Sequence, residues 1–351
     1  MRWDVLCKVV DHHGDVGVAW RLAADLAARG ESVRLYLDDR RALDWMAPNG
    51  AAGVAVAGWS AAAIGGANIV VETFGCGLPA GYAASLPRER PPVWIDVEYL
   101  SAEPYVERSH GLPSPQFDGP ASGLTRWFFY PGFTPRTGGL LREQDLVERQ
   151  RRFDKRAWLR ALGIEVISAA GERLVSLFCY ENDRLDSLLA TLSAEPTLLL
   201  TTAGLAADQV RAALGASGRR GGLRAVELPL LTQRDYDHLL WSCDFNFVRG
   251  EDSFVRAQWV GAPFVWQAYR QTDDAHERKL EAFLDRYLDG GPAIADPSIR
   301  AVFRAWNGFA PWPARLPPQA EWRERCVVWR RTLAEQADLT SQLLRFATER
   351  R

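Results

Sequence analysis

Short apolar segments alternate with amphipathic segments in two series along the chain, and this alternation constrains the fold more than any other feature. Residues 5–10 predict a strand, residues 18–29 a helix with apolar side chains four apart, and residues 32–37 the next strand. A strand–helix–strand order of this kind builds a parallel sheet. Residues 69–71 and 92–97 add two more strands to that sheet.

A second series of the same kind begins after residue 171. Apolar runs again predict strands, and the segments between them predict helices, such as the helix over residues 185–192. The second half is therefore expected to form its own parallel sheet. Its predicted strands cover residues 174–179, 197–201, 226–230, 244–248 and 263–267.

A chain of 351 residues is longer than a typical single domain, so two domains are predicted. The first comprises residues 1–166 with a C-terminal helix over 336–351, and the second comprises residues 167–335. Single helices are expected over residues 144–162 and 321–346. The fold class is α/β, with two doubly wound, Rossmann-like domains facing a central cleft, because ligands of such sheets bind at the carboxyl edges of the strands.

Composition excludes several classes of function. The net charge of −2 provides no basic field for nucleic acid, and no apolar run is long enough for a transmembrane helix. The five cysteines are scattered and the five histidines lack metal-ligand spacing, so buried free thiols and no metal site are expected. These features, and an N-terminus that enters a strand at once, predict a cytoplasmic protein without a nucleic-acid or membrane partner.

The strand-to-helix turn over residues 249–253 is the first candidate site. It carries Arg249, Glu251, Asp252 and Ser253 beside the free N–H groups of a helix start, which favour an anion such as a diphosphate. Two simpler interpretations stay open: the acids can be first-turn charges that suit the helix dipole, and Arg249 can form a surface ion pair with one of them. The combination suits a ligand with phosphates and hydroxyls, such as a nucleotide-sugar.

The loop over residues 11–17 holds a second pair of acids, Asp11 and Asp15. Their spacing would place them on one face of a helix, but Gly14 and Gly17 favour a loop. The alternative to a catalytic pair is an ordinary strand-exit turn with an aspartate capping the next helix.

These segments resemble a known family, the protein-arginine rhamnosyltransferases of bacterial translation elongation factor P (EarP family). Residues 9–23 resemble the opening signature of that family, residues 249–259 the second signature, and residues 263–284 its continuation. One departure is the pair His12 and His13, where an asparagine and an aromatic residue are expected.

The resemblance implies an inverting, metal-independent, two-domain enzyme of the GT-B kind. Such an enzyme moves L-rhamnose from TDP-β-L-rhamnose to a guanidinium nitrogen of one arginine in elongation factor P, with no further cofactor. The first domain would bind the acceptor protein and the second the nucleotide-sugar. The choice of TDP over other nucleotides rests on the resemblance alone.

The resemblance also implies roles for the acids. A guanidinium is a poor nucleophile, so a carboxylate must localise its charge and accept a proton as the new bond forms. Three acids are candidate catalytic residues. Asp15 is the candidate base, Asp11 orients the arginine or holds Asp15, and Glu251 holds sugar hydroxyls or offsets charge as the glycosidic bond stretches; which aspartate takes the proton stays open. The residues expected on the donor side are Arg249, Glu251, Asp252, Ser253, Tyr180, Gln233 and Tyr236.

Tyr180, Gln233 and Tyr236 lie in predicted strand-exit turns that suit a thymine pocket, although ordinary packing explains such residues equally well. The turn over residues 72–75 is a lesser candidate for sugar or acceptor contact, His110 for an acceptor groove, and His276 for a structural histidine. Two other functions fit the same fold. One is transfer to a lipid or small molecule, and the other is a non-catalytic nucleotide-sugar sensor.

Overall fold

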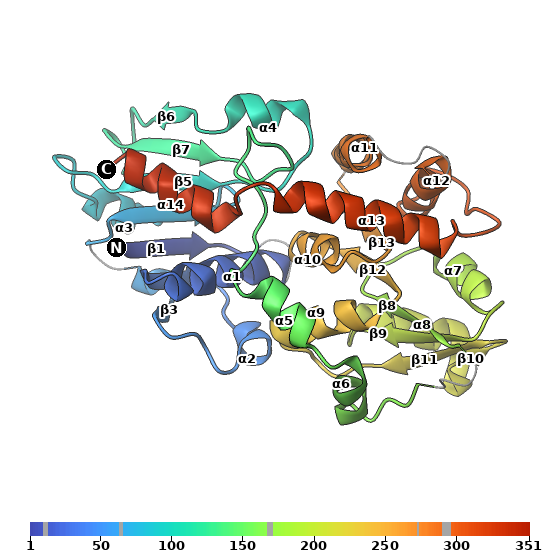
Figure 1. Ribbon diagram of the computed structural model, residues 1–351. Helices are drawn as coiled ribbons and strands as arrows, with labels where there is room; N and C mark the ends of the chain where they lie inside the picture. The colour runs from blue at the N-terminus through green and yellow to red at the C-terminus, as the bar shows by residue number, and fades with distance from the viewer. Residues whose placement is uncertain (10–12, 63–65, 167–170, 272–273, 290–295) are drawn as a thin grey trace. The chain divides into compact units, whose positions relative to one another are not determined.

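A computed structural model describes residues 1–9, 13–62, 66–166, 171–271, 274–289 and 296–351 (Figure 1). The chain forms two compact units, residues 1–146 with 333–351 and residues 147–332, and each is described by itself. Among these described residues, no helix combines the length and the apolar character needed to cross a membrane.

The first unit contains a seven-stranded sheet in the order β3-β2-β1-β4-β5-β7-β6. All pairings are parallel except that of β6 with β7. The predicted parallel sheet is therefore confirmed, and the strand predicted over residues 32–37 is β2 itself. The strands are β1 Arg2–Cys7, β2 Ser32–Leu37, β3 Val54–Gly58, β4 Ile69–Thr73, β5 Val93–Val97, β6 Pro113–Pro115 and β7 Thr125–Phe129.

Helices cover both faces of this sheet because its strands alternate side chains between the faces. Trp3 and Val5 of β1 join one core with residues of α1 and α14, whereas Leu6 joins another core with Tyr82 of α3. In Figure 1 the C-terminal helix α14, in red, runs alongside these strands. The helices of this unit are α1 Gly14–Ala28, α2 Leu43–Met46, α3 Ala80–Ser85, α4 Pro104–Ser109 and α14 Leu339–Glu349.

Helix α1 begins four residues earlier than predicted, at Gly14. The amide of Gly17 donates to the carbonyl of His13 over 3.0 Å, so the second half of the expected loop is helical. A glycine costs about 1 kcal/mol in a helix. Here the burial of neighbouring side chains such as Val16, which is 0% exposed, outweighs that cost.

The helices predicted over residues 144–162 and 321–346 are each divided into two, and an aspartate caps the second of each pair. The segment 144–162 forms α5 Leu146–Arg152 and α6 Lys155–Ala161, because the side chain of Asp154 caps α6 at the amide of Ala157. In the same way, Asp338 caps α14 at Ser341, which separates α14 from α13 Gln319–Ala334. An aspartate at these points satisfies free N–H groups that a continuous helix would not expose.

The boundary of the first unit also differs from the predicted one. Residues 147–166 group with the second unit, because α6 packs on its sheet: Leu159 and Ile164 share a core with Leu198. In addition, the indole nitrogen of Trp158 donates to Asp235 over 3.1 Å. The C-terminal part of the first unit begins at residue 333, whereas residue 336 was predicted.

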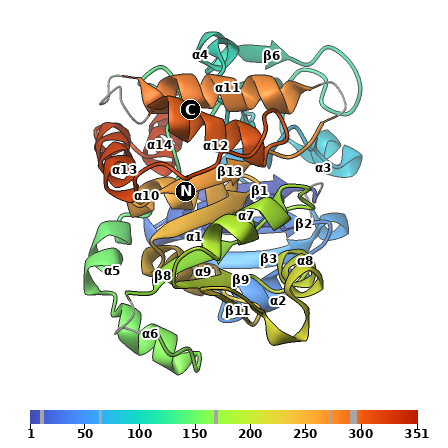
Figure 2. The same cartoon turned by 90° about the vertical axis from the view of Figure 1, so that its right-hand side faces the viewer.

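The second unit contains a six-stranded sheet in the order β10-β11-β9-β8-β12-β13, parallel except for the pair β10–β11. Figure 2 shows α7, α8 and α9 around this sheet. The strands are β8 Arg173–Leu177, β9 Thr197–Thr201, β10 Arg219–Arg220, β11 Leu223–Glu227, β12 Phe245–Arg249 and β13 Phe264–Gln267. The remaining helices are α7 Leu185–Leu192, α8 Leu205–Leu214, α9 Gln233–Ser242, α10 Asp252–Val260, α11 Ala275–Leu288 and α12 Asp296–Trp306.

An aromatic core supports the half of this sheet that carries the candidate turn. Phe254 of α10 stacks on Trp266 of β13 with ring centroids 4.1 Å apart, and Phe283 of α11 meets Phe254 edge to face. All three side chains are at most 5% exposed. Aromatic pairs of this kind hold α10 against the strand ends, so the start of α10 has a rigid base.

His110 secures α14 on the first unit and predicts an acid-sensitive fold. Its ring packs on Phe129 and Phe346, and its Nδ1 accepts from the amide of Tyr130 over 3.0 Å. Burial, and secondarily the charge of Arg350, lowers the pKa of His110 to about 4, below its ordinary value of 6.5. The unfolded chain thus binds the proton more readily, and stability falls as the pH drops from 6.5 towards 4.

We expect the free energy of unfolding to lose on the order of 1–2 kcal/mol from this partly exposed group over that range. Urea unfolding of wild type and His110→Asn at pH 7 and pH 4.5 measures the effect, since asparagine keeps an acceptor for Tyr130 but does not titrate. An equal loss in both proteins would contradict the assignment.

Candidate active site

The predicted turn over residues 249–253 lies at the end of β12 and the start of α10. Gly250 has a φ of 64°, which glycine adopts at no steric cost, and its carbonyl accepts from the indole of Trp266 over 2.9 Å. The hydroxyl of Ser253 hydrogen-bonds both the amide and the carbonyl of Arg249. Ser253 therefore closes the turn, and Glu251 takes the position just before the helix.

The guanidinium of Arg249 lies between two aromatic rings. Its central carbon is 4.4 Å from the ring centroid of Phe178 and 4.3 Å from that of Tyr180. Both rings follow β8, the strand next to β12. A planar guanidinium stacked in this way is held by its faces, and its orientation is fixed.

The other predicted donor residues lie around this stack. The side-chain amide of Gln233, at the start of α9, donates to Asp252 over 3.3 Å. The ring of Tyr236 meets Phe178 edge to face with centroids 5.7 Å apart. Burial raises the pKa of Tyr236 well above its ordinary value, so its hydroxyl stays protonated. The structure thus brings together six residues from three separate segments of the sequence: Tyr180, Gln233, Tyr236, Arg249, Asp252 and Ser253.

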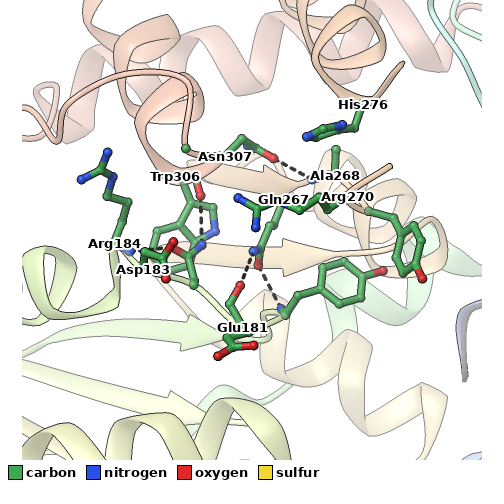
Figure 3. Close-up of a pocket in the computed structure, with 13 residues that line it drawn as sticks. Glu181, Asp183, Arg184, Gln267, Ala268, Arg270, His276, Trp306 and Asn307 are labelled. Carbon is green, nitrogen blue, oxygen red and sulfur yellow. Dashed lines mark hydrogen bonds between the residues drawn. The ribbon is translucent and has the colours of Figure 1, made fainter. Parts of the chain in front are cut away.

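A polar pocket of about 620 Å³ adjoins the stack, with Tyr180 contributing to both. In Figure 3, Asp183 and Arg184 lie on the left of this pocket and His276 at its upper right. Of the residues that line it, only Tyr180 was predicted to contact a ligand. The lining is Tyr180, Glu181, Asn182, Asp183, Arg184, Gln267, Ala268, Tyr269, Arg270, His276, Trp306, Asn307 and Gly308.

Three amide side chains build the floor of this pocket. Gln267 accepts from the amide of Tyr180 over 2.9 Å and donates to the carbonyl of Glu181 over 3.2 Å. Asn307 accepts from Ala268 over 2.9 Å, and Asn182 donates to Trp306 over 2.9 Å. These bonds hold the loop after β8 to the end of β13 and to α12 (Figure 3).

One signal in the sequence pointed to this floor. Gln267 ends the predicted strand over residues 263–267, a position where ligands of α/β sheets bind. The partners of Asn182 and Asn307, by contrast, are set by tertiary contacts that no local spacing reveals.

His276, predicted to be structural, is 6% exposed and accepts from the amide of Gln271 at Nδ1 over 3.4 Å.

The second half of the segment 249–259 stabilises the position of α10. Arg256 forms two 2.8 Å hydrogen bonds with Asp237, and the two side chains are 2% and 1% exposed. Gln258 accepts from the indole of Trp329 over 2.8 Å. These contacts tie α10 to α9 and α13, so this part of the motif holds the helix that carries the site.

Replacing Arg256 by methionine is expected to lower the free energy of unfolding by about 3–5 kcal/mol, because the carboxylate of Asp237 is left buried without its main partner. Urea unfolding measures the change. Arg211→Met is the control: Arg211 pairs with Asp208 on the surface over 2.9 Å, so its loss should lower the stability far less. Equal losses in the two variants would contradict the role of the buried pair.

In the first unit, Asp15 lies in the first turn of α1 and is 2% exposed. The hydroxyl of Tyr99 donates to its Oδ1 over 3.3 Å. Burial raises the pKa of Cys7 far above its ordinary value, and the charge of Asp15 adds to this shift, so that thiol stays neutral. Asp11 and His12 lie outside the described residues, and the ring of His13 meets Trp45 edge to face at 5.3 Å.

Two of the lesser candidates are packed inside the first unit. Glu72 is 0% exposed in β4, where its carboxylate accepts from Arg126 over 3.0 Å. Burial raises the pKa of Glu72 and of its neighbour Asp96. His110 packs against α14, as described above. The proximity of Asp15, in the first unit, to Glu251, in the second, stays a prediction.

Two doubly wound parallel sheets, each with helices around it, define the GT-B class of glycosyltransferases. Solved structures of this class share the fold at low sequence identity. "Spinosyn Rhamnosyltransferase SpnG" has a TM-score of 0.53 at 12% identity, covering 99% of this chain and 100% of its own. "Crystal structure of glycosyltransferase VinC in complex with DTDP" has a TM-score of 0.52 at 13% identity, with the same coverage.

A closer relationship appears at higher identity. A family model described as "Elongation-Factor P (EF-P) rhamnosyltransferase EarP" matches residues 3–348. The protein-arginine rhamnosyltransferases of Pseudomonas putida and Pseudomonas aeruginosa are 43% and 42% identical, over 98% of this chain and 98% of theirs. A structure described as "Structural basis for EarP-mediated arginine glycosylation of translation elongation factor EF-P" has a TM-score of 0.69 at 32% identity, covering 99% of both chains. The chain therefore belongs to the EarP family of elongation factor P rhamnosyltransferases.

Proposed function

We propose that this protein transfers L-rhamnose from TDP-β-L-rhamnose to a guanidinium nitrogen of one arginine in translation elongation factor P, in the cytoplasm and with inversion at the sugar carbon. The observation that supports this most is the family match, which extends over residues 3–348. The arrangement of Arg249 at the start of α10 supports the nucleotide diphosphate as the donor's leaving group.

On the donor side, the fork of Arg249 and the N–H groups of α10 bind the diphosphate and stabilise its charge as it leaves. Gln233 and Tyr236 form the wall for thymine, and Asp252 accepts from a ribose hydroxyl. Glu251 holds hydroxyls of the rhamnose. The polar pocket beyond Tyr180 extends this surface with further hydrogen-bonding groups.

On the acceptor side, the arginine nitrogen attacks the anomeric carbon of rhamnose from the face opposite the diphosphate. The new C–N bond forms as the C–O bond breaks, and the bonding electrons pass to the β-phosphate oxygen. Asp15 accepts the proton released by the nitrogen, while Asp11 orients the guanidinium. A buried carboxylate suits this task, because a charge-assisted hydrogen bond to a guanidinium is strong where water is excluded.

Incubation of the protein with TDP-β-L-rhamnose and elongation factor P tests the proposal. Intact-mass measurement should show a gain of one deoxyhexose, absent when the acceptor arginine is replaced by lysine. Nuclear magnetic resonance of the product should show the α-anomer, as inversion requires. Retention of the β-configuration would contradict the mechanism. Donor binding without transfer would favour a nucleotide-sugar sensor, and transfer only to a lipid or small molecule would favour a different acceptor.

A further inference from the structure

Phe74, directly after β4, has a backbone conformation that a phenylalanine rarely adopts. Its φ is 61°, and among the described residues only Asp274 shares a positive φ without being glycine. This conformation costs on the order of 1–3 kcal/mol and persists only where surrounding contacts impose it. Here the amide of Phe74 donates to Val97 over 2.7 Å, and the amide of Gly75 donates to Asp96 over 3.0 Å.

The strained backbone places the ring of Phe74 on Tyr99. The two rings are stacked, with centroids 4.2 Å apart and planes at 16°. Tyr99 follows β5, the neighbour of β4, and its hydroxyl lies 3.3 Å from Oδ1 of Asp15. A continuous row of contacts thus runs from Phe74 through Tyr99 to Asp15, all within the first unit.

We propose that Tyr99 is a positioning residue for Asp15, and that the strained conformation of Phe74 keeps Tyr99 in place. The inference rests on the proposed function, in which Asp15 accepts the proton of the acceptor arginine. By donating to one carboxylate oxygen, the hydroxyl limits rotation of the carboxylate. Correct orientation of the base contributes a large part of the rate enhancement that an enzyme gains from positioning its reacting groups.

Two thiols and a carboxyl also lie near this row. Burial raises the pKa of the Cys76 thiol to about 12 and that of Cys7 further, so both thiols are neutral next to the acids. The carboxyl of Asp96 accepts from the amide of Gly75 and lies 3.4 Å from the guanidinium of Arg126. The hydrogen bond from Tyr99 to Asp15 strengthens with the charge of the carboxylate.

The first test removes only the hydroxyl, with Tyr99→Phe. We expect kcat for transfer to elongation factor P to fall about tenfold while KM for the donor changes less than about twofold. The ascending limb of the kcat–pH profile should move to higher pH, because the lost bond favoured the ionised carboxylate. Tyr105→Phe removes a hydroxyl from a 40% exposed tyrosine of the same unit and should leave both readouts unchanged.

The second test separates strain from function. Phe74→Gly relieves the positive φ but removes the ring, so the free energy of unfolding should hold or rise while kcat falls about tenfold. Phe117→Gly, at an 86% exposed loop phenylalanine, is the matched control and should keep full activity. A loss of kcat that merely tracks a loss of stability would overturn the role of Phe74.

The double variant Asp15→Asn/Tyr99→Phe completes the cycle. If Tyr99 acts through Asp15, this variant should be no slower than Asp15→Asn alone. A wild-type kcat and pH profile in Tyr99→Phe, or a further tenfold loss in the double variant, would overturn the inference. These outcomes differ from failure of the proposed function, in which the wild-type protein itself would not modify elongation factor P.

Discussion

Replacing Asp15 by asparagine is expected to lower kcat by about 10²- to 10⁴-fold and to leave TDP binding nearly intact. Asparagine has nearly the size and shape of aspartate, but its side-chain amide cannot accept the proton. In the proposed mechanism Asp15 contacts the acceptor arginine and the residues around Arg249 contact TDP, so the change should not disturb the nucleotide. Single-turnover transfer to elongation factor P measures the chemistry, and calorimetry with TDP measures binding.

Asp44→Asn is the matched control for this prediction. Asp44 is also an aspartate in the first turn of a helix of the same unit, but it is exposed. It should therefore keep the wild-type kcat. If Asp15→Asn abolishes TDP binding, the assignment of Asp15 as the base is wrong. If it retains full turnover, the proton goes elsewhere, and Asp11 becomes the next variant to make.

Replacing Arg249 by lysine is expected to weaken TDP binding about 10- to 100-fold. Lysine keeps the positive charge, but its ammonium can neither stack as a plane between Phe178 and Tyr180 nor present two parallel donors to a phosphate. Thymidine lacks the diphosphate, so its affinity should stay the same. Titration of both ligands by calorimetry or competition separates a lost phosphate contact from a damaged nucleoside pocket.

Arg211→Lys is the control for the charge-conserving change, since Arg211 pairs with Asp208 and Glu227 on the surface of the same unit. It should bind TDP as the wild type does. Wild-type TDP affinity in Arg249→Lys would favour the simpler interpretation of Arg249 as a surface ion pair. An equal loss for TDP and thymidine would show that the stack supports the base pocket instead.

Local patterns predicted much of the fold correctly. The strands over 32–37 and 197–201 and the helix over 185–192 match the structure residue for residue. Buried parallel strands are short apolar runs bounded by turns, and this pattern needs no knowledge of the rest of the chain. The strand expected over 226–230 instead covers Leu223–Glu227. There, pairing with β9 sets the position of the strand.

The ends of helices were predicted less well, because local helix propensity and capping compete there with tertiary packing. Gly14 and Gly17 indicated a loop, yet burial of the apolar face of α1 extends the helix through both. Asp154 and Asp338 lie in helical patterns, but each caps a new helix. The free energies of a continued helix and of a newly capped helix differ by only about 1 kcal/mol, so tertiary packing decides between them.

By itself, the sequence determined the class of fold, the family and the candidate residues, because these depend on periodicity and on motifs that are contiguous in the chain. Tertiary structure alone decided which side chains meet: Phe178 and Tyr180 around Arg249, Gln267 across to the loop after β8, and Tyr99 on Asp15. The physical reason is that these contacts join neighbouring strands and helices, so their distances are set by sheet order and packing and not by separation along the chain.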